Sequence, residues 1–310
     1  MMNAKWQAVC LMLLLSLTQL TDAFAQRLAK DAVPFVGAQV FIEPGQTSSQ
    51  IDGWFKTLAE NGMTMCRIRM FESYMKQPDG SWDFSLFDMA FRSAARHGVK
   101  VYATLFPATA KTDIGGWKFP ADDGQKVSFA LFIKALVTHY REHAALAGWV
   151  IVNEPGTDGN YPRTDFVDKA REQWNKVHPE RDYKENGFPV LMTVRNQQFI
   201  YDFTADFLRW IALEIKKYDD THDVHVNPAG VFGNYGEYNF PVWREFLSSL
   251  GGSAHPSWHF GYFSRRQYPL AMLALSELLR SGAGPLPWFM TEIQGGNNIY
   301  SGVQALCPTA

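Results

Sequence analysis

Apolar and polar positions along the chain follow two periods, one typical of buried strands and one typical of helices. Short apolar runs rich in Val, Ile and aromatic residues alternate with longer segments in which apolar residues recur every three or four positions. The apolar runs predict seven parallel strands, at residues 35–42, 64–70, 99–106, 149–152, 223–227, 257–263 and 286–291. The segments between them are long enough to hold crossover helices.

Helical periodicity is clearest after the first strand, where Ile51, Phe55 and Leu58 share one face and Ser48 or Ser49 can cap the helix. Similar patterns predict helices around residues 86–91, 127–142, 165–176, 200–218, 241–250 and 270–280. Between residues 156 and 199 the pattern loosens, which we interpret as an insertion carrying one helix.

Repeated strand–helix units predict an α/β fold, a (β/α)8 TIM-type barrel. Seven units are found where a closed barrel has eight, so we expect the barrel to be truncated after strand seven. Its first and last strands would then expose unpaired edges. Either the chain is a fragment of a longer protein, which we favour, or something else closes the barrel. An oligomer is compatible with the pattern.

The first 25 residues differ from the rest of the chain. Lys5 precedes an apolar run at residues 8–17, and Ala23-Phe-Ala25 has the small residues of a cleavage site. The run is shorter than the roughly 20 residues that a membrane-spanning helix requires, so a membrane anchor is the disfavoured alternative. We therefore expect a signal peptide at residues 1–25, a catalytic barrel domain at 26–310 without a membrane span, and export to the periplasm or the extracellular space.

The charge and the residue composition of the chain indicate which kinds of partner to expect. The formal net charge is −2 and the basic residues are scattered, so we expect no nucleic-acid partner. The chain has 10 Trp, some of which could stack on sugars. Cys66 and Cys307 follow the leader, and their spacing argues against a zinc site. His222 and His225 raise a metal site as an alternative, but solvated histidines are the interpretation we favour. We expect no metal and no cofactor.

Glutamates follow four of the predicted strands, at Glu43, Glu72, Glu154 and Glu292. In parallel barrels the catalytic groups lie at the carboxyl ends of the strands. Taken singly, a strand-end glutamate is more often a cap or a solvent-facing loop residue. Glu154 and Glu292 differ from the other two because each lies directly on its strand end, without intervening turn residues.

Both of these glutamates have neighbours suited to a sugar. Asn153 precedes Glu154, and Pro155 after it disfavours both strand pairing and a helical start. The corresponding neighbours of Glu292 are Trp288, Gln294 and Asn297. Two carboxyl groups about 5–5.5 Å apart hydrolyse a glycosidic bond with retention, one as nucleophile and one as acid/base. Strands four and seven can face each other across the barrel mouth, so we expect a glycosidase.

Four stretches carry a resemblance to a known family. They are Cys66–Phe71 with Pro78–Asp88, Thr104–Thr109 with Trp117, Gly148–Glu154 and Phe289–Gly296. In this order they resemble the retaining glycoside hydrolases of clan A, most closely the family 42 β-galactosidases. The resemblance implies that Glu154 is the acid/base, Glu292 the nucleophile and Asn153 a donor to the sugar 2-hydroxyl. It also implies that Arg67 lies beneath the nucleophile, although a core salt bridge is the alternative for that residue.

The resemblance assigns substrate contacts less firmly. Tyr262 is expected to hydrogen-bond to the nucleophile, and Trp117, Trp258 and Trp288 are candidate sugar platforms, with core packing as the alternative. Pro155 is nearer to the Asn-Glu-Pro of other clan members, such as the endo-acting family 5, and Arg69 has no family role.

The expected activity is hydrolysis of a β-linked glycoside in an oligo- or polysaccharide, with β-galactosides as the first choice. Another clan A specificity, such as an endo-β-glycanase or β-glucosidase, and an inactive sugar-binding fragment stay open.

Overall fold

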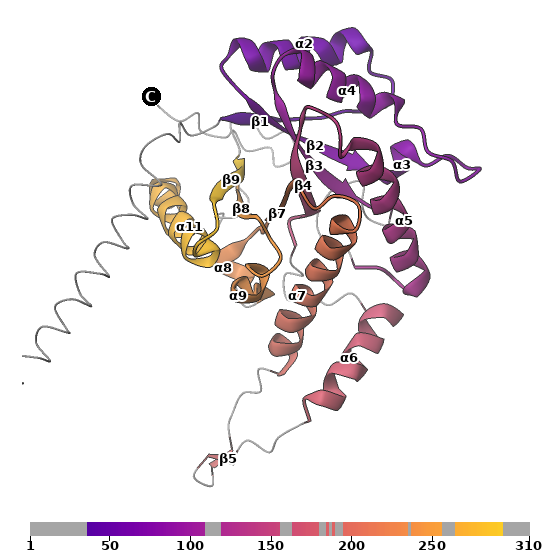
Figure 1. Ribbon diagram of the computed structural model, residues 1–310. Coiled ribbons are helices and arrows are strands. Elements are labelled where there is room, and N and C mark those ends of the chain that lie inside the picture. The colour runs from indigo at the N-terminus through magenta and orange to yellow at the C-terminus, as the bar shows by residue number, and fades with distance from the viewer. Residues whose placement is uncertain are drawn as a thin grey trace, which may run out of the picture.

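The computed structural model describes residues 36–108, 119–155, 163–179, 184–185, 188–189, 195–234, 237–255 and 264–293 of the 310-residue chain. Within these ranges one large sheet forms the centre of the molecule, and helices cover its outer side (Figure 1). Its strands are β1 (Gly37–Val40), β2 (Met65–Phe71), β3 (Lys100–Phe106), β4 (Leu146–Asn153), β7 (Asp223–Asn227), β8 (Ser249–Ala254) and β9 (Trp288–Ile293).

The strands lie in the order β1-β2-β3-β4-β7-β8-β9, and every neighbouring pair is parallel. This is the expected α/β arrangement, a nearly closed barrel of seven strands of the TIM type. In the described part of the chain β1 and β9 are the edges of the sheet and are not hydrogen-bonded to each other. A separate antiparallel pair is formed by β5 (Lys184–Glu185) and β6 (Phe188–Pro189).

The helices lie mostly where the periodicity predicts them. They are α2 (Ser48–Glu60), α3 (Glu72–Met75), α4 (Ser85–Arg96), α5 (Asp123–Tyr140), α6 (Asp165–Val177), α7 (Arg195–Lys216), α8 (Val231–Asn234), α9 (Phe240–Trp243), the 3₁₀ helix η3 (Arg265–Gln267) and α11 (Tyr268–Ala283). Thr47, rather than Ser48 or Ser49, caps α2 in a capping box with Gln50. None of the described helices is long and apolar enough to span a membrane.

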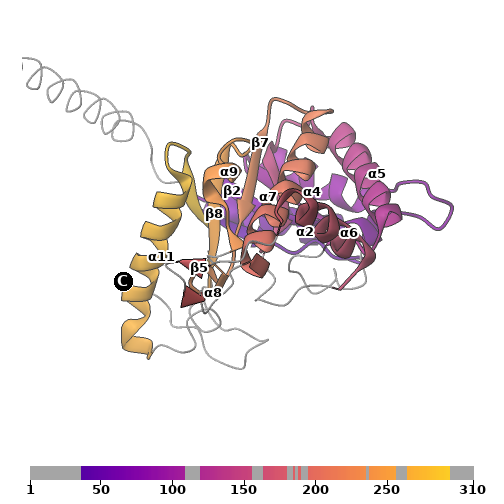
Figure 2. The same ribbon diagram turned by 90° about the horizontal axis from the view of Figure 1, so that it is seen from below.

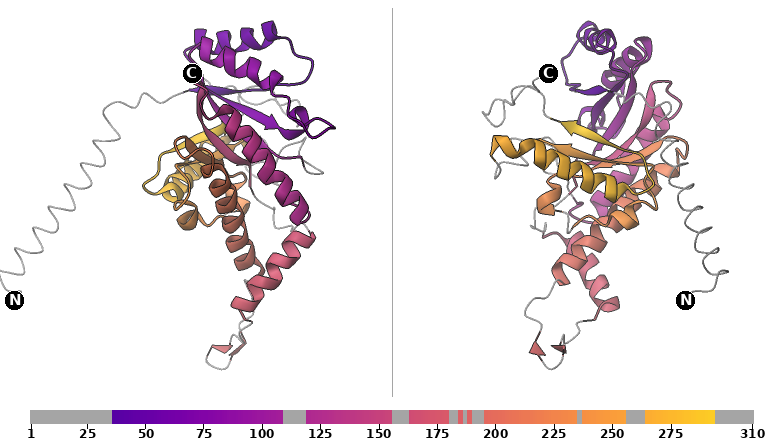
Figure 3. Two further views of the ribbon diagram at one scale, coloured as in Figure 1. Left: turned by 45° about the vertical axis from the view of Figure 1, so that its right-hand side comes forward. Right: turned by 90° about the vertical axis from the view of Figure 1, so that its left-hand side faces the viewer.

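Figure 2 shows α11 beside β8 and α5 on the opposite side of the molecule, so the helices surround the sheet on its convex side. Helix α6 and the β5–β6 pair project away from the sheet (Figure 3), which agrees with the expected insertion between strands four and five. The core is formed where the helices meet the strands.

Strand β4 lies in the buried centre of the sheet. Trp149, Val150 and Ile151 are fully buried, because β4 is covered on both faces. The indole nitrogen of Trp149 donates to Asp219 at 2.8 Å, so the polar group of this large ring is satisfied in the core. Cys66 is buried in β2 as a free thiol.

The predicted position of the sixth strand is wrong. The sequence pattern places this strand at residues 257–263, which lie outside the described residues. In the structure the sixth strand of the sheet is β8, at Ser249–Ala254. The helix expected at 241–250 therefore ends at Trp243. The error has a physical cause, because the β8 sequence Ser-Leu-Gly-Gly-Ser-Ala has low strand propensity.

The two glycines of β8 are required by tertiary packing, although glycine has a low propensity for strands. A Cβ atom at Gly251 would collide with Thr291 and His225, and one at Gly252 would collide with a methyl group of Leu279. Glycine in a strand commonly marks such a close approach. The two glycines let α11 and the neighbouring strands pack tightly against β8.

Candidate active site

Strand β4 positions the first predicted glutamate. Asn153 is the last residue of β4, and Glu154 follows it with φ = 50°. Among the described residues this is the one non-glycine residue with positive φ, and Pro155 follows directly. A left-handed conformation at a residue of this kind costs energy and is typical of functional sites.

The second predicted glutamate comes from β9. Glu292 pairs in register with Ser253 of β8 and lies near the carboxyl end of its strand. One carboxylate oxygen of Glu154, one of Glu292 and one ring nitrogen of His255 all lie within 4.8 Å of one another. The fold therefore brings together two glutamates that are 138 positions apart in the sequence (292 − 154).

Arg67 on β2 lies against Glu292, as the resemblance implies. Its Nη1 contacts Glu292 Oε1 and also donates to Gln39 Oε1 at 3.2 Å. Its Nη2 donates to Asn153 Oδ1 at 2.5 Å, and its Nε donates to Thr104 Oγ1 at 2.8 Å. The Arg67 side chain is 5% exposed. Four strands thus supply the acceptors that make this buried charge tolerable.

The environment of Glu292 favours its ionised form. Burial is the largest single effect and raises the pKa of Glu292, but several neighbours lower it by more in sum, and the positive charge of Arg67 is the largest of these opposing effects. A hydrogen bond and charge from His255 and the charge of Arg69 act in the same direction. Together they lower the pKa of Glu292 to about 2, so this carboxylate is ionised at neutral pH.

The environment of Glu154 favours its neutral form. Burial raises the pKa of Glu154, and the negative charge of Glu292 raises it further. Hydrogen bonding to Ser253 and the charges of His255 and Arg67 oppose this shift without reversing it. Glu154 Oε1 is buried and accepts no hydrogen bond from any described residue. Two carboxyl groups with pKa values pushed apart are the pattern of an acid/base and a nucleophile.

Three polar residues that the sequence pattern does not indicate as site residues complete this cluster. Asn227 Nδ2 donates to Ser253 Oγ at 3.0 Å and lies 3.4 Å from Asn153 Oδ1. Ser253 Oγ donates to Glu292 Oε2 at 3.4 Å. His255 Nε2 lies 3.2 Å from Glu292 Oε2 and 3.7 Å from Glu154 Oε1. Of the three, only Asn227 is indicated by the sequence pattern, because it is the last residue of the predicted fifth strand. Ser253 lies in β8 and His255 follows this strand directly, and the sequence pattern places the sixth strand elsewhere.

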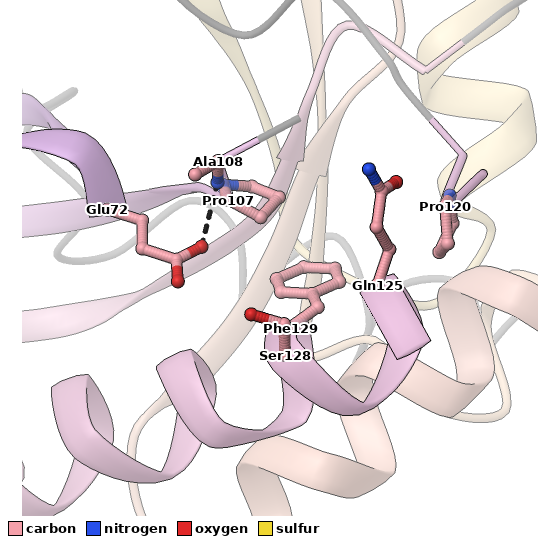
Figure 4. A pocket seen from close by; sticks show the side chains of 7 residues that line it. All are labelled: Glu72, Pro107, Ala108, Pro120, Gln125, Ser128 and Phe129. Atoms are coloured by element: carbon pink, nitrogen blue, oxygen red, sulfur yellow. Dashed lines mark hydrogen bonds between the residues drawn. The ribbon is translucent and has the colours of Figure 1, made fainter. Parts of the chain in front are cut away.

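The other strand-end glutamates have structural partners. Glu43 Oε2 accepts the hydroxyl of Tyr74 at 2.6 Å. Glu72 is buried, accepts the backbone N–H of Ala108 at 2.7 Å and pairs with Lys76 at 3.2 Å. Figure 4 shows the Glu72 carboxylate turned toward Ala108 in a pocket beside the ends of β2 and β3. These contacts explain why Glu43 and Glu72 are not part of the carboxylate pair.

The structure does not bring Trp288 to the carboxylates. Trp288 begins β9 and packs against the core, whereas Glu292 lies four residues further along, about 13 Å away at the rise of a strand. Core packing, the alternative for this ring, is what the structure shows. Trp117, Trp258 and Tyr262 lie outside the described residues, so their expected sugar contacts stay predictions.

His225 is not the solvated histidine that the sequence favours. It is fully buried, its ring nitrogens lie 2.8 Å from Ser249 Oγ and 2.7 Å from Thr291 Oγ1, and it stacks on Phe289. Burial, aided by the charge of Arg67, lowers the pKa of His225 to about 3, so it is a neutral core residue. Its partner in the metal alternative, His222, instead contacts Asp219 at 2.9 Å.

One group of residues has the spacing of metal ligands, namely Glu154, His255 and Glu292. Arg67 already pairs with Glu292, and the raised pKa of Glu154 disfavours the ionised form that a metal ion would need. The donor set therefore suits proton transfer and nucleophilic attack better than it suits a cation.

No protein-family profile matches the sequence, and no curated protein matches it significantly. Solved structures do share the fold. The β-galactosidase of Rahnella sp. R3 is 13% identical with a TM-score of 0.67, over 90% of this chain and 47% of its own. The β-galactosidase of Marinomonas ef1 is 15% identical with a TM-score of 0.64, over 84% of this chain and 48% of its own.

A second group of similar structures has another specificity. The endo-1,4-β-D-mannanase of Thermotoga petrophila RKU-1 is 14% identical with a TM-score of 0.60, over 85% of this chain and 80% of its own. This chain spans about half the length of the β-galactosidases that it matches. At these identities the likeness establishes a fold shared with glycoside hydrolases.

Proposed function

We propose that the chain is a retaining glycoside hydrolase that cleaves β-linked glycosides, with β-galactosides as the first substrate class to test. The observation that carries this proposal is the pairing of Glu154 and Glu292. Their nearest oxygens lie within 4.8 Å at the carboxyl ends of two parallel strands, and their pKa values shift in opposite directions. The short separation suits direct nucleophilic attack, because the inverting mechanism needs about 6.5–9.5 Å to admit a water.

The first step follows from the two protonation states. Protonated Glu154 gives its proton to the glycosidic oxygen as the bond between this oxygen and the anomeric carbon breaks. An oxygen of ionised Glu292 forms a new bond to the anomeric carbon from the opposite face. The products are a glycosyl-enzyme ester and the free leaving alcohol, and Glu154 is now ionised.

The second step restores the enzyme. Ionised Glu154 takes a proton from water while the water oxygen bonds to the anomeric carbon and the ester bond to Glu292 breaks. Glu154 is protonated again and Glu292 is again a carboxylate. Two inversions at one carbon give a product with the β configuration of the substrate.

Asn153 is placed to bind the sugar beside these groups. Its Oδ1 accepts from Arg67 and lies near the side-chain NH₂ group of Asn227. These contacts fix the orientation of the Asn153 amide, so that its own NH₂ group points away from Arg67 and Asn227. We assign this NH₂ group to the sugar 2-hydroxyl. Contacts of this kind strengthen in the oxocarbenium-like transition state.

Azide rescue of two alanine variants tests the proposal. On an aryl β-galactoside, Glu292→Ala and Glu154→Ala should each lose at least about 100-fold in kcat. Azide should then restore turnover of Glu292→Ala with an α-glycosyl azide product, and of Glu154→Ala with a β-glycosyl azide product. Glu43→Ala is the matched control, because Glu43 also follows a strand but contacts Tyr74. Unchanged turnover in both variants would disprove the assignment of the pair.

An endo-acting specificity is the second candidate. The likeness to the T. petrophila mannanase extends over a larger share of that chain than the likeness to the β-galactosidases does. Parallel assays on β-mannan and on aryl β-galactosides decide between the two. Binding without turnover of any glycoside would instead support the inactive sugar-binding alternative.

We also propose that the protein acts outside the cytoplasm. The support is the leader-like pattern of residues 1–25, which lie outside the described residues. Amino-terminal sequencing of the protein recovered from the periplasm or the medium tests this. A mature chain that begins near residue 26 is expected, and retention of the leader in the cytoplasm would contradict it.

A further inference from the structure

The turn that carries Glu154 has a conformation that its own sequence disfavours. Glu154 has φ = 50°, in the left-handed region that non-glycine residues seldom adopt. Pro155 follows it, and the residue before a proline prefers an extended conformation. Such a conformation persists only where the surrounding structure imposes it through several contacts. The contacts that hold this turn therefore decide where the carboxyl group of Glu154 lies.

Tyr238 makes one of these contacts. Its hydroxyl group lies 2.6 Å from the carbonyl oxygen of Pro155 and 2.6 Å from the carbonyl oxygen of Ala229. A phenol has one O–H proton, so the two carbonyl oxygens share a single donor. Pro155 lies two residues after the end of β4, and Ala229 lies two residues after the end of β7. The hydroxyl group thus joins the segments that follow two neighbouring strands.

The ring of Tyr238 is held by packing. Tyr238 is 2% exposed, and its ring centre lies 5.8 Å from that of Phe240 and 5.3 Å from that of Trp243. Phe240 and Trp243 are the first and last residues of α9 and pack edge to face with each other. A buried hydroxyl group on a ring packed in this way is a fixed point for the turn after β4.

Backbone pairing alone holds the end of β4 irregularly. Val150 pairs with His225 and Asn153 pairs with Asn227, so β4 has one more residue than β7 between these two pairs. An irregularity of this kind bends a strand, and it commonly lies beside an active site, where it redirects a side chain. The contact of Tyr238 lies beyond the last of these pairs and fixes the chain after the irregularity.

We infer that Tyr238 is a positioning residue for Glu154. Its hydroxyl group holds the carbonyl group of Pro155 and thereby keeps Glu154 in the conformation that presents its carboxyl group to the glycosidic oxygen. The inference rests on the proposed function, in which Glu154 gives the proton. Tyr238 acts through Glu154 and does not contact the reacting atoms. Loss of its hydroxyl group should therefore impair proton transfer and spare nucleophilic attack by Glu292.

Leaving groups of different acidity test the inference on one series of aryl β-glycosides, the series that the wild type hydrolyses fastest. The constant kcat/KM reports the first step, in which a phenolate needs the proton from Glu154 and a dinitrophenolate does not. Tyr238→Phe removes the hydroxyl group and keeps the ring. We expect kcat/KM of this variant to fall by at least about tenfold for the phenyl glycoside and by less than about threefold for the dinitrophenyl glycoside.

Tyr140→Phe is the matched control. Tyr140 is 1% exposed, and its hydroxyl group donates to Asp88 at 3.0 Å, which joins α5 to α4. This variant also loses the hydrogen bond of a buried hydroxyl group, so its free energy of unfolding should fall. Its kcat/KM should equal that of the wild type for both glycosides.

A double-mutant comparison separates positioning from packing. In a Glu154→Gln background the proton is already lost, so Tyr238→Phe should change kcat/KM for the phenyl glycoside by less than about twofold. Pro155→Ala loosens the same turn and leaves the hydroxyl group of Tyr238 in place. It should show the same dependence on the leaving group, and it provides the test if Tyr238→Phe does not fold.

Three results would overturn the inference and leave the glycosidase intact. They are an equal loss on both glycosides in Tyr238→Phe, no loss on either, and an undiminished loss in the Glu154→Gln background. Failure of the wild type to hydrolyse any aryl β-glycoside would instead count against the proposed function itself.

Discussion

The guanidinium group of Arg67, on β2, contacts the carboxylate of Glu292, on β9, beside the opening of the barrel. Among the described residues, β1 and β9 share no backbone hydrogen bonds, yet Arg67 reaches Glu292 while its Nη1 also donates to Gln39 of β1. Side chains therefore connect the first and last strands where the sheet itself does not. The same contact sets the charge of the proposed nucleophile.

Replacing Arg67 by Met should impair both catalysis and folding. Loss of the cation leaves Glu292 buried without its main partner, which typically costs about 3–5 kcal/mol. We expect kcat/KM to fall by at least about 100-fold, and the acid limb of its pH profile to move to higher pH because the pKa of Glu292 rises. Steady-state kinetics between pH 3 and pH 9 measure this, with Arg92→Met, at an exposed arginine on α4, as the control.

The same variant has a predicted pH dependence of stability. In the wild type the lowered pKa of Glu292 stabilises the fold above the ordinary carboxyl pKa of 4.5, and this stabilisation is lost as pH falls toward about 2. The difference in unfolding free energy between wild type and Arg67→Met should therefore be largest near neutral pH and shrink on acidification. Urea titrations at several pH values test this, and a difference that grows on acidification would contradict it.

Glu154→Gln should remove one limb of the pH profile. Because Glu154 must carry a proton, wild-type kcat/KM declines as pH rises through its raised pKa. The glutamine variant cannot give a proton, so it should lose about 10²–10⁴-fold on substrates with poor leaving groups and much less on dinitrophenyl glycosides. Its alkaline limb should be absent. A variant that keeps the wild-type alkaline limb would assign that limb to another group.

His255→Gln tests the residue that lies between the two glutamates. His255 lowers the pKa of Glu292 by a hydrogen bond and by charge, and lowers that of Glu154 by charge. We expect both limbs of the kcat/KM profile to move to higher pH in the variant, by less than Arg67→Met moves the acid limb. His178→Gln, at an exposed histidine after α6, is the matched control. An unchanged profile with lower kcat would show that His255 acts only in packing.

Gly251→Ala and Gly53→Ala should have opposite effects on stability. A Cβ at Gly251 meets Thr291 and His225, so the substitution should cost about 1–3 kcal/mol by overpacking. Gly53 lies in α2 with open space around its Cβ position, so alanine there should stabilise the protein by up to about 1 kcal/mol. Chemical denaturation measures both free energies of unfolding. A stable Gly251→Ala variant would contradict the packing described for β8.

The position of the two glutamates of the candidate site could be predicted because the carboxyl ends of parallel strands lie at one end of a barrel. Glu154 was found because β4 is a continuous apolar run broken by Pro155, and Glu292 because a second apolar run precedes it. The partners Thr104 and Ser253 could not be found in this way, since each is a small polar residue within a strand. Their roles depend on which strands are neighbours.

The errors also have physical causes. β8 was misplaced because its two glycines serve packing against Thr291 and Leu279, and no local propensity records that contact. Trp288 was expected near the sugar because it is close to Glu292 in sequence, although four residues of strand separate the two ends of β9. The neutral state of His225 depends on its complete burial, which its alternation with the polar residues Asp223 and Asn227 does not indicate.

The most direct test of the central claim is covalent trapping of the nucleophile. Wild-type protein is incubated with dinitrophenyl 2-deoxy-2-fluoro-β-glycosides of the galactose and glucose series, then digested and mapped by mass spectrometry. We predict one sugar attached to the peptide that contains Glu292, an ester that Glu292→Gln does not form. A sugar attached to a different carboxylate, with the Glu292 peptide unmodified, would contradict the account.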